Sequence, residues 1–192
     1  MPSAIHDFTS RRFCAAIHRK VSNIPGHDWD SVTDVGSTRF HDASGRGKEG
    51  DDGLRCLSRI GGQAWPNLMI EVGYSESLRQ LRMDVEWWLL SSGGDTKLTI
   101  LILARLNPNS FHIEVWMMDP NPGCITGPSL GTRPIRTRSI DIDATGAVTP
   151  PNGTLTIPYD ALFDNPNANG TDIILTAKDL SLIASAIFEQ AR

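Results

Sequence analysis

The chain has 192 residues, of which 40% are hydrophobic and 21% are charged. A chain of this size can bury a real apolar core, so we predict one domain over residues 1–192. No apolar run approaches the roughly 18 residues that a membrane helix requires, which predicts a soluble protein without a membrane span. The formal net charge of -4 argues against a strongly basic nucleic-acid binder but does not exclude a nuclease.

The N-terminal residues and the cysteines bear on location and metal binding. No continuous apolar stretch precedes Arg11, so the start of the chain does not resemble a secretory signal, and we expect an intracellular protein of the cytoplasm or nucleus. Three cysteines, Cys14, Cys56 and Cys124, are too few and too widely spaced for a disulfide framework or a zinc site. We expect buried or idle thiols, and the five histidines show no ligand spacing.

The first half of the chain contains helical and strand patterns in alternation. Apolar residues at helical spacing predict an amphipathic helix from Asp7 to Val21. Many β-branched residues in 31–43 predict a strand, and the glycines and charges of 44–48 predict an exposed turn. A short strand is expected from Leu54 to Ile60.

A central strand, a helix and a hairpin follow. The near-continuous apolar run from Asn67 to Tyr74 predicts a buried strand, and Ser75 is expected to cap a helix whose apolar stripe continues to Leu89. The runs Leu98 to Leu103 and Phe111 to Met118 predict an antiparallel hairpin. A strand, a helix and a strand in this order require a crossover. The predicted class is therefore α/β, with a mixed central sheet and flanking helices.

The composition shifts toward Pro, Gly, Asn and Thr after residue 118. We therefore divide the domain into a core of residues 1–118 and a Pro/Gly-rich, irregular, β-rich extension of residues 119–192. Short β-like pieces such as Arg136 to Ile142 are expected there. A helix from Ala177 or Asp179 to Ala191 closes the chain.

Glu71 requires a chemical explanation, because an ionised carboxylate in an apolar strand is costly unless it is paired, hydrogen-bonded or bound to metal. Upstream, Asp51 and Asp52 stand where a short strand begins, so a neighbouring strand can bring one of them beside Glu71. Two such carboxylates suit Mg²⁺ or Mn²⁺, which polarises a phosphodiester and activates a water. The alternative is an edge-strand acid that is solvated or paired with Arg79 or Arg82.

Two segments carry a resemblance to a known family. These are Lys48-Glu49-Gly50-Asp51 and the motif P-x-L-x-I-E-V-G-x-S-E-S, which spans Pro66 to Ser77. Together they resemble the PD-(D/E)XK nuclease superfamily, in particular its small restriction-endonuclease-like proteins that are abundant in fungi. The similarity continues through Leu81-Arg82, Asp84, 87–89 and 114–116. It implies a nuclease-like core of helix, strands, helix and strand hairpin.

The resemblance also implies the metal ligands. In the family pattern a Pro-Asp pair supplies the first ligand, and Gly50-Asp51 occupies that place here, with the proline lost. Asp51 is therefore the implied ligand, and Asp52 is its substitute. The second acid of the family falls on Glu71. With Mg²⁺ or Mn²⁺ bound, these residues would make the chain a phosphodiesterase acting on DNA or RNA.

The catalytic cation of the family is missing from its usual place. Gly73 stands where the family has lysine, and relatives with this gap supply a Lys or Arg from the following helix. Arg79 or Arg82 is therefore the expected substitute. Loss of the proline and the lysine leaves a second function open, a catalytically degenerate nuclease fold that serves as a binding or protein-interaction module. Nucleic acid, a protein partner or a second copy of the chain are all compatible with the sequence.

Overall fold

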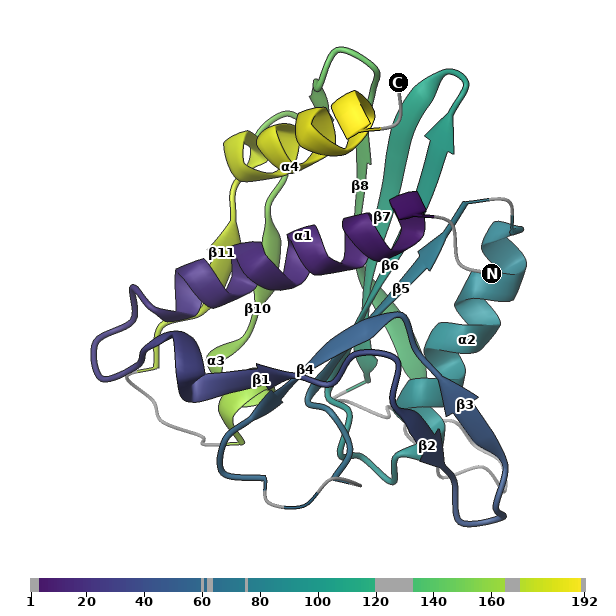
Figure 1. Cartoon of the computed structure of the whole chain (residues 1–192), viewed down its shortest axis with the longest axis vertical. Helices are drawn as coiled ribbons and strands as arrows, with labels where there is room; N and C mark the ends of the chain where they lie inside the picture. Colours follow the sequence, from purple (N-terminus) through teal and green to yellow (C-terminus); the bar gives the residue numbers. More distant parts are fainter. Residues whose placement is uncertain are drawn as a thin grey trace.

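The computed structural model describes residues 4–59, 61, 64–74, 76–119, 133–164 and 170–190. Ser75 and Cys124, on which two predictions rest, lie outside these residues. The described part of the chain forms a seven-stranded mixed sheet with helices on both sides, accompanied by two two-stranded sheets (Figure 1). The predicted α/β class with a mixed central sheet is confirmed.

The helical segments are α1 (Ala4–Val21), the short 3-10 turn η1 (Trp29–Ser31), α2 (Leu78–Ser91), α3 (Tyr159–Phe163) and α4 (Ala177–Gln190). The strands of the central sheet are β1 (Val32–Asp34), β4 (Asp52–Cys56), β5 (Leu68–Gly73), β6 (Leu98–Leu106), β7 (Asn109–Met118), β8 (Pro134–Ile142) and β9 (Val148–Thr149). The smaller sheets pair β2 (Arg39–His41) with β3 (Gly47–Glu49) and β10 (Leu155–Ile157) with β11 (Ile173–Leu175). Among the described helices, none combines the length and the apolarity that crossing a bilayer demands.

The strand order in the central sheet is β1-β4-β5-β6-β7-β8-β9. β5 and β6 run parallel and are connected through α2, whereas the other neighbouring strands are antiparallel. Every residue of β5 is buried, as is expected for a strand covered on both faces. The predicted hairpin is confirmed as β6 and β7.

Alternation along β5 decides which face each side chain occupies. Leu68, Ile70 and Val72 belong to the main core, which α1 and α4 cover. Met69 instead packs against Trp88 of α2, together with the β2–β3 hairpin. Figure 1 shows α1 and α4 on one side of the sheet and α2 on the other. Since side chains two apart share a face, Glu71 belongs to the α2 side.

The start of α2 differs slightly from the prediction. Ser77 is the N-cap, and its side-chain oxygen accepts a hydrogen bond from the backbone N–H of Gln80 at 3.2 Å. This bond satisfies one of the amides that the first turn of a helix leaves without a partner. The predicted apolar stripe is buried as expected and includes Leu81, Val85 and Leu89.

Residues after 118 contribute more to the fold than an extension would. β8 pairs with β7 and continues the central sheet. α4 packs on α1, and the ring of Phe188 stacks on that of Phe111 with centroids 5.0 Å apart. The sequence of β8 lacks the apolar pattern of a central strand. Its residues before Ile140 are exposed or half-buried, as is usual for a strand near the edge of a sheet.

Candidate functional site

Asp51 is the aspartate that lies beside Glu71. In the antiparallel register of β4 and β5, Asp52 stands opposite Ile70, so Asp51, one residue earlier, stands opposite Glu71. The negative charge of Asp51 accordingly acts on the Glu71 carboxyl.

Glu71 is held by two residues from the elements that cover its face. Its side chain is buried, and Oε1 accepts a hydrogen bond from the indole Nε1 of Trp88 on α2. The Nζ atom of Lys48, on β3, lies 3.5 Å from the same oxygen. Lys48 Nζ also lies 2.5 Å from Oδ1 of Asp84 on α2. The ammonium beside Glu71 therefore comes from the β2–β3 hairpin.

Asp51 is fixed mainly by backbone. Its Oδ2 accepts a hydrogen bond from the backbone N–H of Val72 at 2.6 Å and lies 3.2 Å from Nε2 of His6 on α1. This bond ties the residue before β4 to the residue after Glu71. The hydrogen bond therefore fixes the position of the Asp51 carboxylate relative to the backbone of β5, which carries Glu71.

Burial raises the pKa of both carboxyls. Burial raises the pKa of Asp51 to about 7, against the opposing effects of the Val72 N–H and of Lys48. Burial raises the pKa of Glu71 to about 8, although the charge of Lys48 opposes it. The charge of Asp51 raises the pKa of Glu71 further. Two acids that repel each other in a dry site favour a positive ion between them.

Two glycines explain where the site departs from the family pattern. A Cβ atom at Gly73 would come within 2.3 Å of Cδ1 of Leu81, so the first turns of α2 occupy the space that a lysine side chain would need. A Cβ atom at Gly50 would come within 2.0 Å of Cε of Met69 and 3.0 Å of the Trp88 ring. Leu81 of α2 therefore restricts position 73, whereas position 50 is restricted by Trp88 of α2 and by the end of the Met69 side chain from β5.

The two arginines expected to replace the missing lysine lie elsewhere. Arg79 is exposed in the first turn of α2. Arg82 donates two hydrogen bonds to Glu114 on β7, from Nε at 3.0 Å and from Nη2 at 2.5 Å. Since β7 is two strands away from β5, this contact directs the guanidinium of Arg82 away from Glu71.

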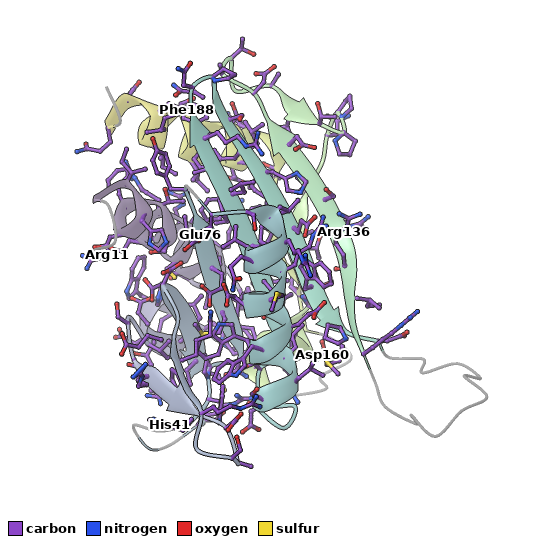
Figure 2. The ribbon with its side chains drawn as sticks, turned by 90° about the vertical axis from the view of Figure 1, so that its right-hand side faces the viewer. Arg11, His41, Glu76, Arg136, Asp160 and Phe188 are labelled. Carbon is purple, nitrogen blue, oxygen red and sulfur yellow. The ribbon has the colours of Figure 1, made fainter. Side chains whose placement is uncertain are left out.

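Glu114 lies between two arginines on the side of α2 that faces β7 and β8. Besides Arg82, it accepts hydrogen bonds from Nη1 of Arg136 at 2.6 Å and from Nε1 of Trp116 at 3.0 Å, and His112 Nε2 lies 3.0 Å away. Burial opposes ionisation, but these donors outweigh it and lower the pKa of Glu114 to about 2. Figure 2 shows Arg136 on one side of α2 and Glu76 near its N-terminal end on the other.

Asp52 belongs to the opposite face of the sheet. Its Oδ1 accepts hydrogen bonds from the backbone N–H of Gly53 at 2.9 Å and of Gly36 at 3.2 Å. Its carboxylate lies beside Cys14 of α1 and Asp34 of β1. The contacts of Asp51 and Asp52 therefore assign these residues to different clusters.

The arrangement around Glu71 is suited to a hard cation. Within the described segments, the hydrogen bonds of the pair engage Oε1 of Glu71 and Oδ2 of Asp51, which leaves Oε2 and Oδ1 for a ligand. Carboxylate oxygens are the donors that Mg²⁺ and Mn²⁺ prefer. The donor set therefore fits the implied metal, with Lys48 as a neighbouring charge.

Sequence reasoning overlooked Lys48, Asp84 and Trp88 as parts of this site. Lys48 and Asp84 stand inside the segments that carry the family resemblance, which was the available signal. Their meeting depends on how the β2–β3 hairpin folds over α2, and nothing in the local pattern shows it.

Comparison with known proteins adds no assignment to this geometry. Neither any protein-family model nor any curated protein matches the sequence.

Proposed function

We propose that this protein is a divalent-metal-dependent phosphodiesterase of the PD-(D/E)XK type that acts on nucleic acid. Asp51 and Glu71 would hold Mg²⁺ or Mn²⁺. Lys48 would replace the lysine that the family carries two residues after its second acid. The observation that carries the proposal is the position of Lys48, whose Nζ lies 3.5 Å from Oε1 of Glu71.

Each residue has a distinct role in this proposal. A bound cation supplies a Lewis acid and lowers the pKa of a water molecule. Lys48 places a positive charge where negative charge develops on the phosphoryl oxygens during attack. Trp88 orients Glu71 through its indole N–H, as outer residues orient the ligands of metal sites. Asp84 holds Lys48 toward Glu71.

The order of the elements supports the family assignment. α1, β4, β5, α2 and the β6–β7 hairpin follow one another as the resemblance implies. Close packing accompanies both departures from the motif, since a side chain at residue 50 or 73 would have to displace the end of Met69 or of Leu81. In this proposal Lys48 of β3 supplies the positive charge that is missing from position 73.

The test is cleavage of labelled single-stranded and double-stranded DNA and RNA by the purified chain, with Mg²⁺, with Mn²⁺ or with a chelator. We expect cleavage that requires the metal. Glu71→Gln and Asp51→Asn should each lower its rate by at least about 100-fold, and Lys48→Met by a similar factor, as when one charge-stabilising donor is removed. The matched controls are Glu86→Gln and Lys178→Met, which neutralise an exposed acid and an exposed lysine and should leave the rate unchanged.

Two results would contradict the proposal. Cleavage that persists at the same rate in Glu71→Gln would show that a contaminating nuclease or another site is responsible. Absence of cleavage on every substrate, together with absence of Mg²⁺ or Mn²⁺ binding in calorimetry, would remove the metal from the site.

Specific observations favour a second candidate, a nuclease fold that binds nucleic acid or protein without cutting. Glu71 is only 5% exposed, which restricts access of a phosphate to its carboxyl. Lys48 is engaged by Asp84 at 2.5 Å, which lowers its availability to a substrate. Metal binding in calorimetry combined with no turnover on any substrate would identify this function.

A further inference from the structure

A second cluster of ligand-type side chains lies on the face of the sheet opposite Glu71. Cys14 on α1, Asp34 on β1 and Asp52 on β4 each offer one atom, and these atoms lie within 4.8 Å of one another. Cys14 and Asp52 are buried, and Asp34 is exposed. The cluster therefore joins three elements that are separate in the sequence, with one open side.

His18 borders this cluster and points one ring nitrogen toward it. It lies four residues after Cys14 on α1, so the two side chains share a face of the helix. The ring is buried and stacks on Trp29 with centroids 4.5 Å apart. Its Nε2 lies 3.0 Å from Oδ1 of Asp34.

The hydrogen bonds of His18 require a positive charge between it and Asp34. Nδ1 lies 3.0 Å from the backbone oxygen of Trp29. A carbonyl can only accept, so Nδ1 carries the hydrogen. In a neutral ring Nε2 would then direct a lone pair at a carboxylate oxygen. Either a second proton on the ring or a metal ion removes this repulsion.

The surroundings match those of a metal site. Histidine ligands generally donate their second ring N–H to a carbonyl or carboxylate, as His18 does to Trp29. Ligating carboxylates are themselves hydrogen-bonded, as Asp52 is by the amides of Gly36 and Gly53. Burial raises the pKa of the Cys14 thiol, so the metal has to displace its proton on binding.

We propose that Cys14, His18, Asp34 and Asp52 form a zinc site that fastens α1 to β1 and β4. One thiolate and two carboxylates make three donors that already lie together, and movement of the bordering His18 ring toward them would supply the fourth donor that closed structural zinc sites use. The thiolate selects Zn²⁺ or Co²⁺ over Mg²⁺. Bonds of about 2.0 to 2.1 Å to N and O place two tetrahedral ligands about 3.3 Å apart, close to the present separation of Nε2 and Oδ1.

The site is distinct from the one that contains Glu71. Asp52 is covalently bonded to Asp51, yet the two carboxylates have separate partners: the amides of Gly36 and Gly53 bind Asp52, and the amide of Val72 binds Asp51. The ligands also differ in kind, because the Glu71 site offers oxygen atoms and the zinc site includes sulfur and nitrogen. Failure of one proposal therefore leaves the other standing.

Cobalt is the probe for the test. The full chain is stripped with a chelator and titrated with Co²⁺ while its absorption spectrum is followed. We expect one equivalent to produce a thiolate-to-cobalt charge-transfer band and intense visible bands of tetrahedral cobalt. Zn²⁺ should displace the cobalt and erase both, and it should raise the melting temperature of the chain.

Variants decide whether these four residues are responsible. Cys14→Ala should abolish the charge-transfer band, whereas Cys56→Ser, a change at another buried free cysteine, should retain it. Asp34→Asn replaces an exposed side chain, so it keeps the fold, and it should weaken Co²⁺ binding by at least about tenfold. Glu71→Gln should bind Co²⁺ here with unchanged affinity.

Two outcomes would overturn the zinc site. One is a wild-type chain that gives no charge-transfer band at several equivalents of Co²⁺, which would leave His18 and Asp34 as an ordinary ion pair. The other is a band that survives in Cys14→Ala, or an affinity that Asp34→Asn leaves unchanged.

Discussion

Replacing Glu71 with glutamine removes an ionisable group from a dry site and keeps the size of the side chain. The amide oxygen of glutamine can still accept the hydrogen bond from Nε1 of Trp88. The variant therefore isolates the effect of the negative charge. We expect the difference in the free energy of unfolding between variant and wild type to depend strongly on pH.

The magnitude follows from the pKa of Glu71, which burial raises from 4.5 to about 8. Between these values the folded chain retains a proton that the unfolded chain has lost, so stability falls as pH rises. The favourable contribution is complete below the unfolded pKa and is lost as pH passes the folded pKa. At about 1.4 kcal/mol per pKa unit, the wild type should lose roughly 4 kcal/mol relative to Glu71→Gln between pH 5 and pH 9.

The assay is urea unfolding of both proteins from pH 5 to pH 9, with a chelator present and tryptophan fluorescence as the signal. Glu86→Gln removes an exposed acid from α2 and should follow the wild type at every pH. Addition of Mg²⁺ at pH 8 should stabilise the wild type by about 3 kcal/mol at 100 times its dissociation constant, and Glu71→Gln much less.

Parallel stability curves for Glu71→Gln and the wild type would refute the reasoning. They would mean that the Glu71 carboxyl ionises with an ordinary pKa. Water would then have to reach the carboxyl, and ionising Glu71 beside Asp51 would carry no energetic cost for a bound cation to relieve.

Three further predictions concern packing and charge. Gly73→Ala should lower the free energy of unfolding by about 1 to 3 kcal/mol in denaturant titrations, because its Cβ would lie 2.3 Å from Leu81. Arg82→Leu should cost about 1 to 2 kcal/mol at pH 7, since Glu114 keeps its other donors, and unchanged stability would show that those donors suffice. Glu114→Gln should lose little at pH 2 and more at pH 7, because the charge of Glu114 stabilises the fold above pH 4.5 and its contribution is lost as pH falls to about 2.

The elements were largely predictable because their signals are local. The apolar run that contains Glu71 became β5, and the stripe ending at Leu89 became the buried face of α2. The proximity of Asp51 to Glu71 was also predictable, because it requires only that the two strands be neighbours in the sheet. Boundaries such as Ser77 for the cap of α2 depend on turn geometry, and the pattern alone did not locate them.

The source of the positive charge was not predictable in the same way. Arg79 or Arg82 was expected because relatives in the resembling family that lack the lysine supply a cation from the following helix, yet the ammonium beside Glu71 belongs to Lys48. Only the tertiary packing shows that Leu81 fills the space beside Gly73. Similarly, no sequence pattern indicated a cluster at Cys14, because its convergence with Asp34 and Asp52 requires three elements to meet.

The indole rings are placed so that the protein carries its own optical probes. Trp88 donates to Glu71, Trp116 donates to Glu114, and Trp29 stacks on His18. Trp65 and Trp87 surround Trp88, with ring centroids 5.8 and 4.9 Å from its own. Near-ultraviolet circular dichroism should therefore be dominated by the Trp88 group and change when an ion reaches Glu71. Emission from the half-exposed Trp29 should instead follow events at His18, so each cluster can be monitored without a label.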